Sequence, residues 1–406
     1  MAVLAVCGDV VALSAGSVLT VVPLRGSSSR PFFYDCSTAE RKPLDNKSED
    51  DVCEGQGSDR ILAAAFSASG NYFALTDDNK RLILFCTKPS WKCISIRAVV
   101  RRCSSLTITL SEDRIFVADK SGDVYSFAIA EPQKKGQLEL GHLSMLLDVA
   151  VSPDDKYIIT ADRDEKIRVS LLKAPHNIAS FCLGHREFVS RILVLPNAGN
   201  LLLSSSGDST LRLWEYEEGR EVQCCDLTSY SSSGGENLEK KIAVSRIIYC
   251  RPGNFIAVLC DSFPVVYLFQ FDIVSQRLIH TQSIPLKHRG WDIAFDAASG
   301  LWVLQEDKDE IIALYRLVEG QWQQAFDDKE LKKISTIFRE RWALLQECLG
   351  GKTFYGDLYK STHDNMASYL SKKRERQEQM KKRKGKHLEE NKHLKKLKTE
   401  TPSSCL

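Results

Sequence analysis

The sequence predicts an all-β fold, a seven-bladed β-propeller, and two observations carry this prediction. The first is a repeat: residues 141–170 and 184–214 place Gly-His, Ser or Pro, Asp and a closing strand in the same order, 43 or 44 positions apart. A period of about 40 to 45 residues is typical of propeller blades. The second is a succession of short apolar runs split by turn residues, the pattern of four-stranded antiparallel blades.

The second copy of the repeat matches the WD-repeat signature closely in the stretch GDSTLRLWE. This resemblance implies that His185, a serine within residues 204–206, Asp208 and Trp214 form a hydrogen-bonded set between strands. A buried polar group without a partner costs about 1 to 3 kcal/mol. We therefore interpret these residues, and His142 in the first copy, as structural and not catalytic.

Strands are expected wherever short apolar runs alternate with turn residues. The N-terminal part predicts strands at 3–6 and 18–22 and a blade end at 32–35, followed by a polar insertion at 36–59. The next strands are expected at 61–66, 72–75, 82–85, 106–110, 115–118 and 124–127. After the paired repeats come 246–249, 256–260, 265–269, 291–295, 301–304 and 311–315.

Seven residues close the predicted blades, which gives the number of blades. They are Tyr34, Phe85, Phe127, Ser170, Trp214, Phe269 and Tyr315. Two intervals are longer than the others because they hold polar insertions, at 36–59 and 229–241. If the N-terminal strands complete the last blade, the ring is sealed and no sheet edge stays open.

The propeller is therefore assigned to residues 1–325, and two further segments follow it. Residues 326–370 are expected to pack on the propeller: 330–347 suits an amphipathic helix, with a last strand as the alternative, and 355–369 suits a short helix or an irregular docking segment. Residues 371–406 form a basic tail that is expected to be disordered. Between residues 372 and 398 it holds 13 Lys or Arg against four Glu, although the whole chain has a net charge of +2.

The composition is that of an ordinary globular protein, with 43% hydrophobic and 27% charged residues. The 13 cysteines contain no C-x-x-C pair, and most lie in apolar runs. This pattern indicates reduced cysteines in an intracellular protein, not a disulfide framework or a zinc site. No apolar run reaches the roughly 18 residues of a membrane span, so none is expected.

No enzyme motif occurs in a context that would support catalysis. The sequence lacks a G-x-G-x-x-G after a strand, a G-x-x-x-x-G-K-[ST], an H-E-x-x-H and a G-x-S-x-G. Carboxylate pairs such as Asp77 with Asp78 and Asp154 with Asp155 fall in predicted turns. We therefore predict no catalytic residue, no cofactor site and no metal site in this chain.

Charged residues gather on turns of the predicted third and fourth blades. The fourth blade carries six charges within seven residues: Asp162, Arg163, Asp164, Glu165, Lys166 and Arg168. Lys120 and Asp123 lie on the equivalent turn of the third blade. These residues are either a solvated blade edge or a docking surface, in which alternating signs give register and fast encounter. In a docking surface, Lys166 and Arg168 would be the main anchors.

Longer stretches resemble one family. The runs VADKSGDVYSF at 117–127, LGHLSMLLDVAVSPDD at 140–155 and TADRDEKIRVS at 160–170 are similar to the WD-repeat, non-catalytic subunit of the tRNA (guanine-N7)-methyltransferase. Two departures stand out: Ser170 replaces the usual aromatic residue of the repeat, and Glu215 replaces the usual Asp.

This resemblance implies a scaffold that binds a catalytic chain side-on, through the turns described above. The partner would bind S-adenosylmethionine and methylate a guanosine in the tRNA variable loop. The tail would lie near the tRNA, with its first cations as contacts: Lys372, Lys373, Arg374 and Arg376. From its residues alone, the tail fits nuclear import, phosphate contact or simple solubility. We expect a nuclear protein, with the cytoplasm as a second location.

Two other classes of function stay open at this point. A general protein-interaction propeller, such as a ubiquitin-ligase substrate receptor or a chromatin adaptor, would hold a peptide at its central channel or top face without any dependence on tRNA. A propeller enzyme would need convergent carboxylates or a metal cluster in the channel, and the sequence predicts neither.

Overall fold

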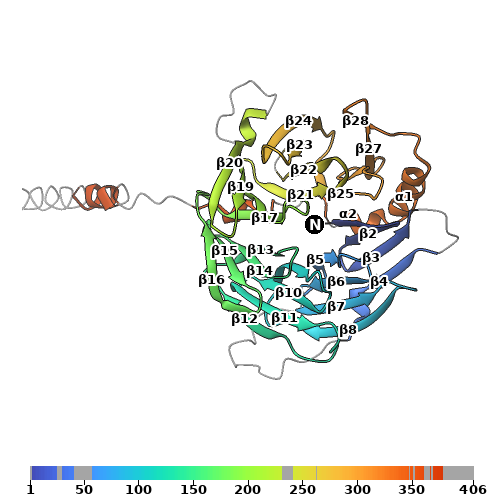
Figure 1. Cartoon of the computed structure of the whole chain (residues 1–406), viewed down its shortest axis with the longest axis horizontal. Coiled ribbons are helices and arrows are strands. Elements are labelled where there is room, and N and C mark those ends of the chain that lie inside the picture. The colour runs from blue at the N-terminus through green and yellow to red at the C-terminus, as the bar shows by residue number, and fades with distance from the viewer. Residues whose placement is uncertain are drawn as a thin grey trace, which may run out of the picture. The chain divides into compact units, whose positions relative to one another are not determined.

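The computed structural model describes residues 2–24, 30–40, 57–230, 241–261, 263–346, 348–350, 353–360, 366 and 369–377. In these residues, 28 strands form seven four-stranded antiparallel sheets, arranged as blades around a centre (Figure 1). The predicted seven-bladed, all-β propeller is confirmed. One compact unit spans residues 1–359, and residues 360–406 form a second unit.

The first four blades follow one another along the chain. Blade 1 contains β1 (Val3–Cys7), β2 (Val10–Ala15), β3 (Val18–Pro23) and β4 (Phe32–Asp35). Blade 2 contains β5 (Ile61–Phe66), β6 (Tyr72–Asp77), β7 (Arg81–Cys86) and β8 (Lys92–Ala98). Blade 3 contains β9 (Cys103–Ile108), β10 (Arg114–Asp119), β11 (Asp123–Ala128) and β12 (Gln137–Gly141). Blade 4 contains β13 (Leu146–Val151), β14 (Tyr157–Asp162), β15 (Ile167–Leu171) and β16 (Ala174–Cys182).

Three more blades complete the ring. Blade 5 contains β17 (Val189–Val194), β18 (Leu201–Ser206), β19 (Thr210–Glu215) and β20 (Arg220–Asp226). Blade 6 contains β21 (Val244–Cys250), β22 (Phe255–Cys260), β23 (Val265–Asp272) and β24 (Arg277–Pro285). Blade 7 contains β25 (Gly290–Phe295), β26 (Leu301–Gln305), β27 (Ile312–Val318) and β28 (Gln321–Gln324). Single 3-10 turns occur at η1 (Cys36–Thr38), η3 (Leu227–Tyr230), η4 (Pro252–Asn254) and η5 (Gly356–Leu358).

The expectation that the N-terminal strands complete the last blade is wrong. β1 to β4 form a sheet of their own, and β25 to β28 form another. The first 23 residues already supply three paired strands, because tight turns at Gly8 and Gly16, with φ of 56° and 55°, fold the chain back on itself. Tyr34 consequently lies on the outer strand of blade 1, whereas Phe85 and the later closing residues lie on third strands.

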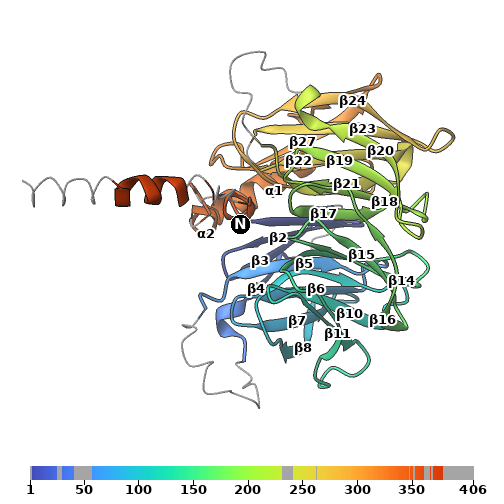
Figure 2. The same cartoon turned by 90° about the vertical axis from the view of Figure 1, so that its left-hand side faces the viewer.

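The ring is closed instead by packing between blades 1 and 7. The Leu4 backbone N–H donates to the Asp292 carboxylate at 2.8 Å. Two C-terminal helices, α1 (Lys329–Glu340) and α2 (Trp342–Gln346), cover this seam (Figures 1 and 2). The helical alternative for 330–347 is therefore confirmed. Their buried side chains share one hydrophobic cluster with both blades, and the members from the helices are Leu331, Ile334, Phe338, Trp342 and Leu345.

Polar contacts hold the same two helices on blade 1. Asp328 caps α1 by accepting hydrogen bonds from the backbone N–H groups of Glu330 and Leu331. The Lys333 ammonium donates to the Pro23 carbonyl at 2.8 Å, and the Arg341 guanidinium lies 4.3 Å from the centre of the Phe33 ring. The C-terminal segment is thus part of the folded propeller unit.

Candidate partner-docking site

Blade 5 contains the hydrogen-bonded set of a WD repeat. His185 Nδ1 lies 3.1 Å from Asp208 Oδ2, and His185 Nε2 lies 2.8 Å from Ser204 Oγ. Trp214 Nε1 donates to the same Ser204 hydroxyl at 2.8 Å. The set joins the loop before β17 to β18 and β19, so these side chains fix the blade and leave no free reactive group.

Blade 4 repeats this set without the tryptophan. His142 Nδ1 lies 3.0 Å from Asp162 Oδ2, and Nε2 lies 2.8 Å from Thr160 Oγ1. Ser170 stands at the position of Trp214, is fully buried, and accepts a hydrogen bond from Arg168 Nε at 2.9 Å. The missing aromatic ring is therefore accompanied by an arginine that binds into the blade.

The six charged residues of the blade 4 turn do not share one environment. Asp162 is 2% exposed and accepts the Lys166 backbone N–H at 2.9 Å. Arg168 also donates to the Gly141 and Pro175 carbonyls at 3.1 and 2.9 Å, and burial lowers the pKa of its guanidinium. Asp164 and Lys166 are exposed, whereas Glu165 is half-buried.

The blade 3 turn lies close to the blade 4 turn. The Gly122 carbonyl accepts the His142 N–H at 2.8 Å, and the Met145 carbonyl accepts the Arg163 N–H at 2.9 Å. Residues 142–145 therefore contact both turns at once. Lys120 is exposed at the blade 3 turn, and Asp123 is half-buried beside it. The structure thus brings the eight predicted partner-binding residues together on one end of blades 3 and 4.

The C-terminal segment reaches the same end of the ring. Residues 353–359, here called the strap, place Tyr355 (1% exposed) and Leu358 in a cluster with Leu147, Phe188 and Ala243. The Tyr355 ring stacks on Phe188 at 5.6 Å, and the Tyr359 ring meets Phe188 edge-on at 5.0 Å. The sequence left this segment open as a helix or a docking segment; it is mostly irregular and docked.

The strap also touches both charged turns. The Leu358 carbonyl accepts Arg163 Nε at 3.4 Å, and Lys120 Nζ lies 5.8 Å from the centre of the Phe354 ring. Two of the eight predicted residues are therefore in contact with the strap as well as with their own blades.

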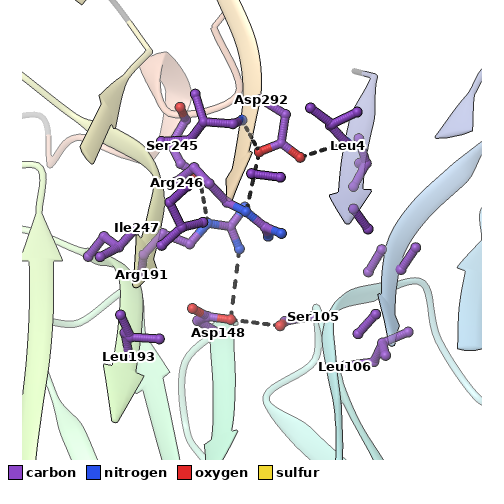
Figure 3. A pocket seen from close by; sticks show the side chains of 18 of the residues that line it. Leu4, Ser105, Leu106, Asp148, Arg191, Leu193, Ser245, Arg246, Ile247 and Asp292 are labelled. Atoms are coloured by element: carbon purple, nitrogen blue, oxygen red, sulfur yellow. Dashed lines mark hydrogen bonds and ion pairs between the residues drawn. The ribbon is translucent and has the colours of Figure 1, made fainter. Parts of the chain in front are cut away.

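The centre of the ring holds two aspartates that join neighbouring blades. In the channel cavity of about 460 Å³, Asp148 accepts the Ile192 N–H at 2.9 Å and the Ser105 hydroxyl at 2.7 Å (Figure 3). Asp292 holds Leu4 in the equivalent way, and Arg246 Nε lies 3.2 Å from its carboxylate. Burial raises the pKa of Asp292, and Arg246 with the backbone donors opposes this shift.

A second cavity of about 420 Å³ lies at the end of the channel nearest the two turns, and Phe354 and Lys120 are among its lining residues. Tyr355 forms a hydrogen bond with Arg191 there. The channel residues and the strap were not predicted from the sequence, because their partners are far apart in the chain. The register breaks before Asp148 and Asp292 give no periodic signal.

The described part of the chain offers little to support chemistry of its own. It contains no group of three or more His, Cys, Asp or Glu side chains placed to hold a metal ion. Neither channel aspartate is free, since each accepts backbone N–H groups. No helix within the described ranges is long and apolar enough to cross a membrane.

The predicted tRNA-contacting cations lie in the second unit. Lys372, Lys373, Arg374 and Arg376 are exposed on a helical stretch, residues 369–377. Lys373 Nζ lies 5.9 Å from the centre of the Tyr369 ring. The remainder of the tail, 378–406, and most of the two polar insertions, 41–56 and 231–240, fall outside the described residues.

Comparison with known proteins places this arrangement in a family. The model of the tRNA methyltransferase TRM82 WD40 domain matches residues 36–137 and 129–313. The chain belongs to the TRM82 WD40 family. It is 55% identical over 368 residues to the "tRNA (guanine-N(7)-)-methyltransferase non-catalytic subunit WDR4" of Bos taurus, covering 90% of this chain and 89% of that protein.

Other members of the TRM82 WD40 family extend the match. The protein of the same name from Homo sapiens is 53% identical over 370 residues, covering 91% of this chain and 89% of that protein. The one from Danio rerio is 50% identical and covers 99% and 98%. A solved structure of U3-55K has a TM-score of 0.59 with 16% identity and covers 81% of this chain and 92% of that chain. This last likeness supports the propeller fold.

Proposed function

We propose that this chain is the non-catalytic subunit of a heterodimeric tRNA (guanine-N7)-methyltransferase. It holds a catalytic chain in position for 7-methylguanosine formation in the tRNA variable loop. The observation that carries the proposal is family membership over almost the whole chain, since relatives with 50 to 55% identity bear the name of that subunit. S-adenosylmethionine is bound by the catalytic chain in this proposal, and this chain contributes no catalytic residue.

The proposed docking surface is the end of blades 3 and 4 that carries the two charged turns. Lys120, Asp164 and Lys166 are exposed there with both signs of charge close together. Charges at the edge of an interface raise the association rate and fix the register of the partner. Arg168 and Asp162 support the surface from below, because both are held by hydrogen bonds within blade 4.

The alternative of a general peptide-binding propeller fits this structure less well. It requires a free site for a peptide at the channel or on the top face. The end of the channel nearest the charged turns already holds the chain's own strap, with Tyr355 only 1% exposed. We propose that the exposed basic tail contacts tRNA phosphates and supports nuclear localisation.

The proposal is tested by reversing two exposed cations of the docking surface. In the Lys120→Glu, Lys166→Glu double variant we expect the affinity for the catalytic subunit to fall about tenfold or more, a loss of at least about 1.4 kcal/mol. Both side chains are exposed, so the melting temperature should not change. The affinity is measured by titration calorimetry with the purified catalytic subunit.

The matched control reverses two exposed cations at the other end of the blades. Lys173 lies just beyond the far end of β15 from Lys166, and Lys92 begins β8. The Lys92→Glu, Lys173→Glu variant carries the same charge change and should bind as the unaltered chain does. Equal loss of affinity in both double variants would mean that net charge, and not this surface, sets the affinity. Absence of any complex with the unaltered chain would refute the proposed function.

A further inference from the structure

The loop between β12 and β13, residues 142–145, is fixed between the two charged turns. Its N-terminal end donates to the Gly122 carbonyl of blade 3, and its C-terminal end accepts from Arg163 of blade 4. Gly122 has a φ of 100°, and a Cβ there would lie 2.6 Å from the carbonyl oxygens of His142 and Ser144. The loop therefore packs directly against the Gly122 backbone, without an intervening side chain.

Leu143 at the tip of this loop is exposed to solvent without any cover. Its relative exposure is 109%, the largest of the exposed large hydrophobic side chains in the described residues. His142 before it is buried in the Asp162 and Thr160 hydrogen bonds, so the chain direction at Leu143 is set by the blade. A leucine held rigidly in water loses little conformational freedom when a partner covers it.

The surroundings of Leu143 have the composition of an interface. Charges of both signs flank it, with Lys120 on one turn and Asp164 and Lys166 on the other. A second apolar group, Phe354 of the strap, is 39% exposed and lies beside Lys120. Protein interfaces typically join an apolar centre to a polar rim, and a few apolar or aromatic side chains carry most of the affinity.

We propose that Leu143 is the apolar anchor by which the catalytic chain docks on this subunit, with Phe354 beside it. This inference rests on the proposed function. The partner surface that fits is an apolar pocket bordered by both basic and acidic side chains, the complement of Asp164 and of Lys120 with Lys166. The occupant is the catalytic chain, because the exposed leucine lies between the two turns already assigned to it.

The test uses the full-length chain with a Leu143→Asp substitution and the purified catalytic subunit. Covering a leucine side chain changes affinity by roughly 10- to 100-fold, so we expect the dissociation constant to rise by at least about tenfold. The melting temperature of the isolated subunit should stay the same, since Leu143 contacts nothing in the fold that it would leave. Leu143→Met, which keeps an apolar side chain of similar size, should retain most of the affinity.

Val274 provides the matched control. It is 93% exposed in the turn between β23 and β24 of blade 6, remote from both charged turns. Val274→Asp introduces the same charge at an equally exposed apolar position and should leave the dissociation constant unchanged. If the unaltered chain binds the catalytic subunit and Leu143→Asp binds equally well, the anchor is refuted while the proposed function stands.

Two other outcomes would also overturn the inference. If Leu143→Asp abolishes self-association of the isolated subunit in sedimentation velocity and leaves the heterodimer intact, the occupant is a second copy of this chain. If Val274→Asp weakens the complex as much as Leu143→Asp does, the effect comes from added negative charge. If no complex forms with the unaltered chain, the proposed function itself fails before the anchor is at issue.

Discussion

Asp208 shows how one residue holds a blade together through its charge. Burial by itself would raise the pKa of this carboxyl. Hydrogen bonds with His185, from Thr210 and from the Arg186 backbone outweigh that effect and hold the pKa well below its usual range. The side chain is 8% exposed, so the donors around it have no water to replace a lost carboxylate. The aspartate therefore stabilises the folded state in its ionised form.

Removing this carboxylate should destabilise the propeller. In Asp208→Ala, His185 and the Arg186 N–H lose a charged acceptor, and we expect the free energy of unfolding to fall by about 2 to 3 kcal/mol. Urea denaturation followed by circular dichroism at pH 7 measures the change. Asp164→Ala, in the equivalent turn of blade 4 but exposed, is the control and should be nearly neutral. A loss of the same size in both variants would contradict the role assigned to Asp208.

The same pair of variants gives a pH dependence with a defined sign. The folded pKa of Asp208 is depressed below the unfolded value of about 3.9, so its contribution is fully present above that value. It is lost as the pH falls through the folded pKa. The difference in unfolding free energy between the unaltered chain and Asp208→Ala should thus be constant from pH 7 to about 5 and shrink at lower pH.

The charged turn of blade 4 shows what the sequence predicts at the scale of residues and what it does not. Six charges in seven residues suggest one surface. The structure buries Asp162 against His142, binds Arg168 to Ser170 and two carbonyls, and leaves Asp164 and Lys166 exposed. A tight turn points successive side chains in different directions, and charge alone does not tell which ones face inward.

At the scale of elements, strands differ in how well the sequence predicts them. β18 (Leu201–Ser206) is buried at every position, and such continuous burial gives the short apolar runs that the sequence analysis located. β16 (Ala174–Cys182) is exposed at five of nine positions and follows no alternation, because it is the outer strand and has one edge in solvent. The outer strands were therefore largely missed, and Tyr34, on such a strand, was assigned to the wrong position.

Helix α1 is an element whose value lies in the seam that it covers. Phe338 is fully buried between blades 1 and 7, so Phe338→Ala leaves a cavity in the cluster that closes the ring. We expect the free energy of unfolding to fall by about 3 to 5 kcal/mol. Thr336→Ala changes an exposed residue of the same helix and should cost far less. Urea denaturation of both variants measures the difference, and equal stability would show that the seam does not depend on α1.

At the scale of the whole molecule, ring closure depends on pairs that no local pattern reveals. Leu4 and Asp292 are 288 positions apart, yet their hydrogen bond repeats what Asp148 and Ile192 do between blades 4 and 5. The propeller therefore joins its last blade to its first with the same device that joins two consecutive blades. The number of blades follows from sequence periodicity, but the point of closure follows only from these long-range contacts.

The last prediction concerns the complete complex on tRNA. Replacing Lys372, Lys373, Arg374 and Arg376 with glutamine removes four exposed cations. Each phosphate neutralised by protein contributes about 0.7 to 0.9 to the slope of log affinity against log salt. If all four contact phosphates, the slope measured for the heterodimer with tRNA should become shallower by about three units. Electrophoretic mobility shifts over a range of salt concentrations provide the measurement.

A variant with the same loss of charge on the propeller separates contact from net charge. Lys92, Lys134, Lys173 and Arg277 are exposed on outer strands and on turns away from the docking surface, and their replacement by glutamine removes the same four charges. Counterion release depends on phosphates in contact, so this variant should keep the original slope. A slope unchanged in the tail variant would exclude these four cations from the tRNA interface, while partner binding through blades 3 and 4 would be unaffected.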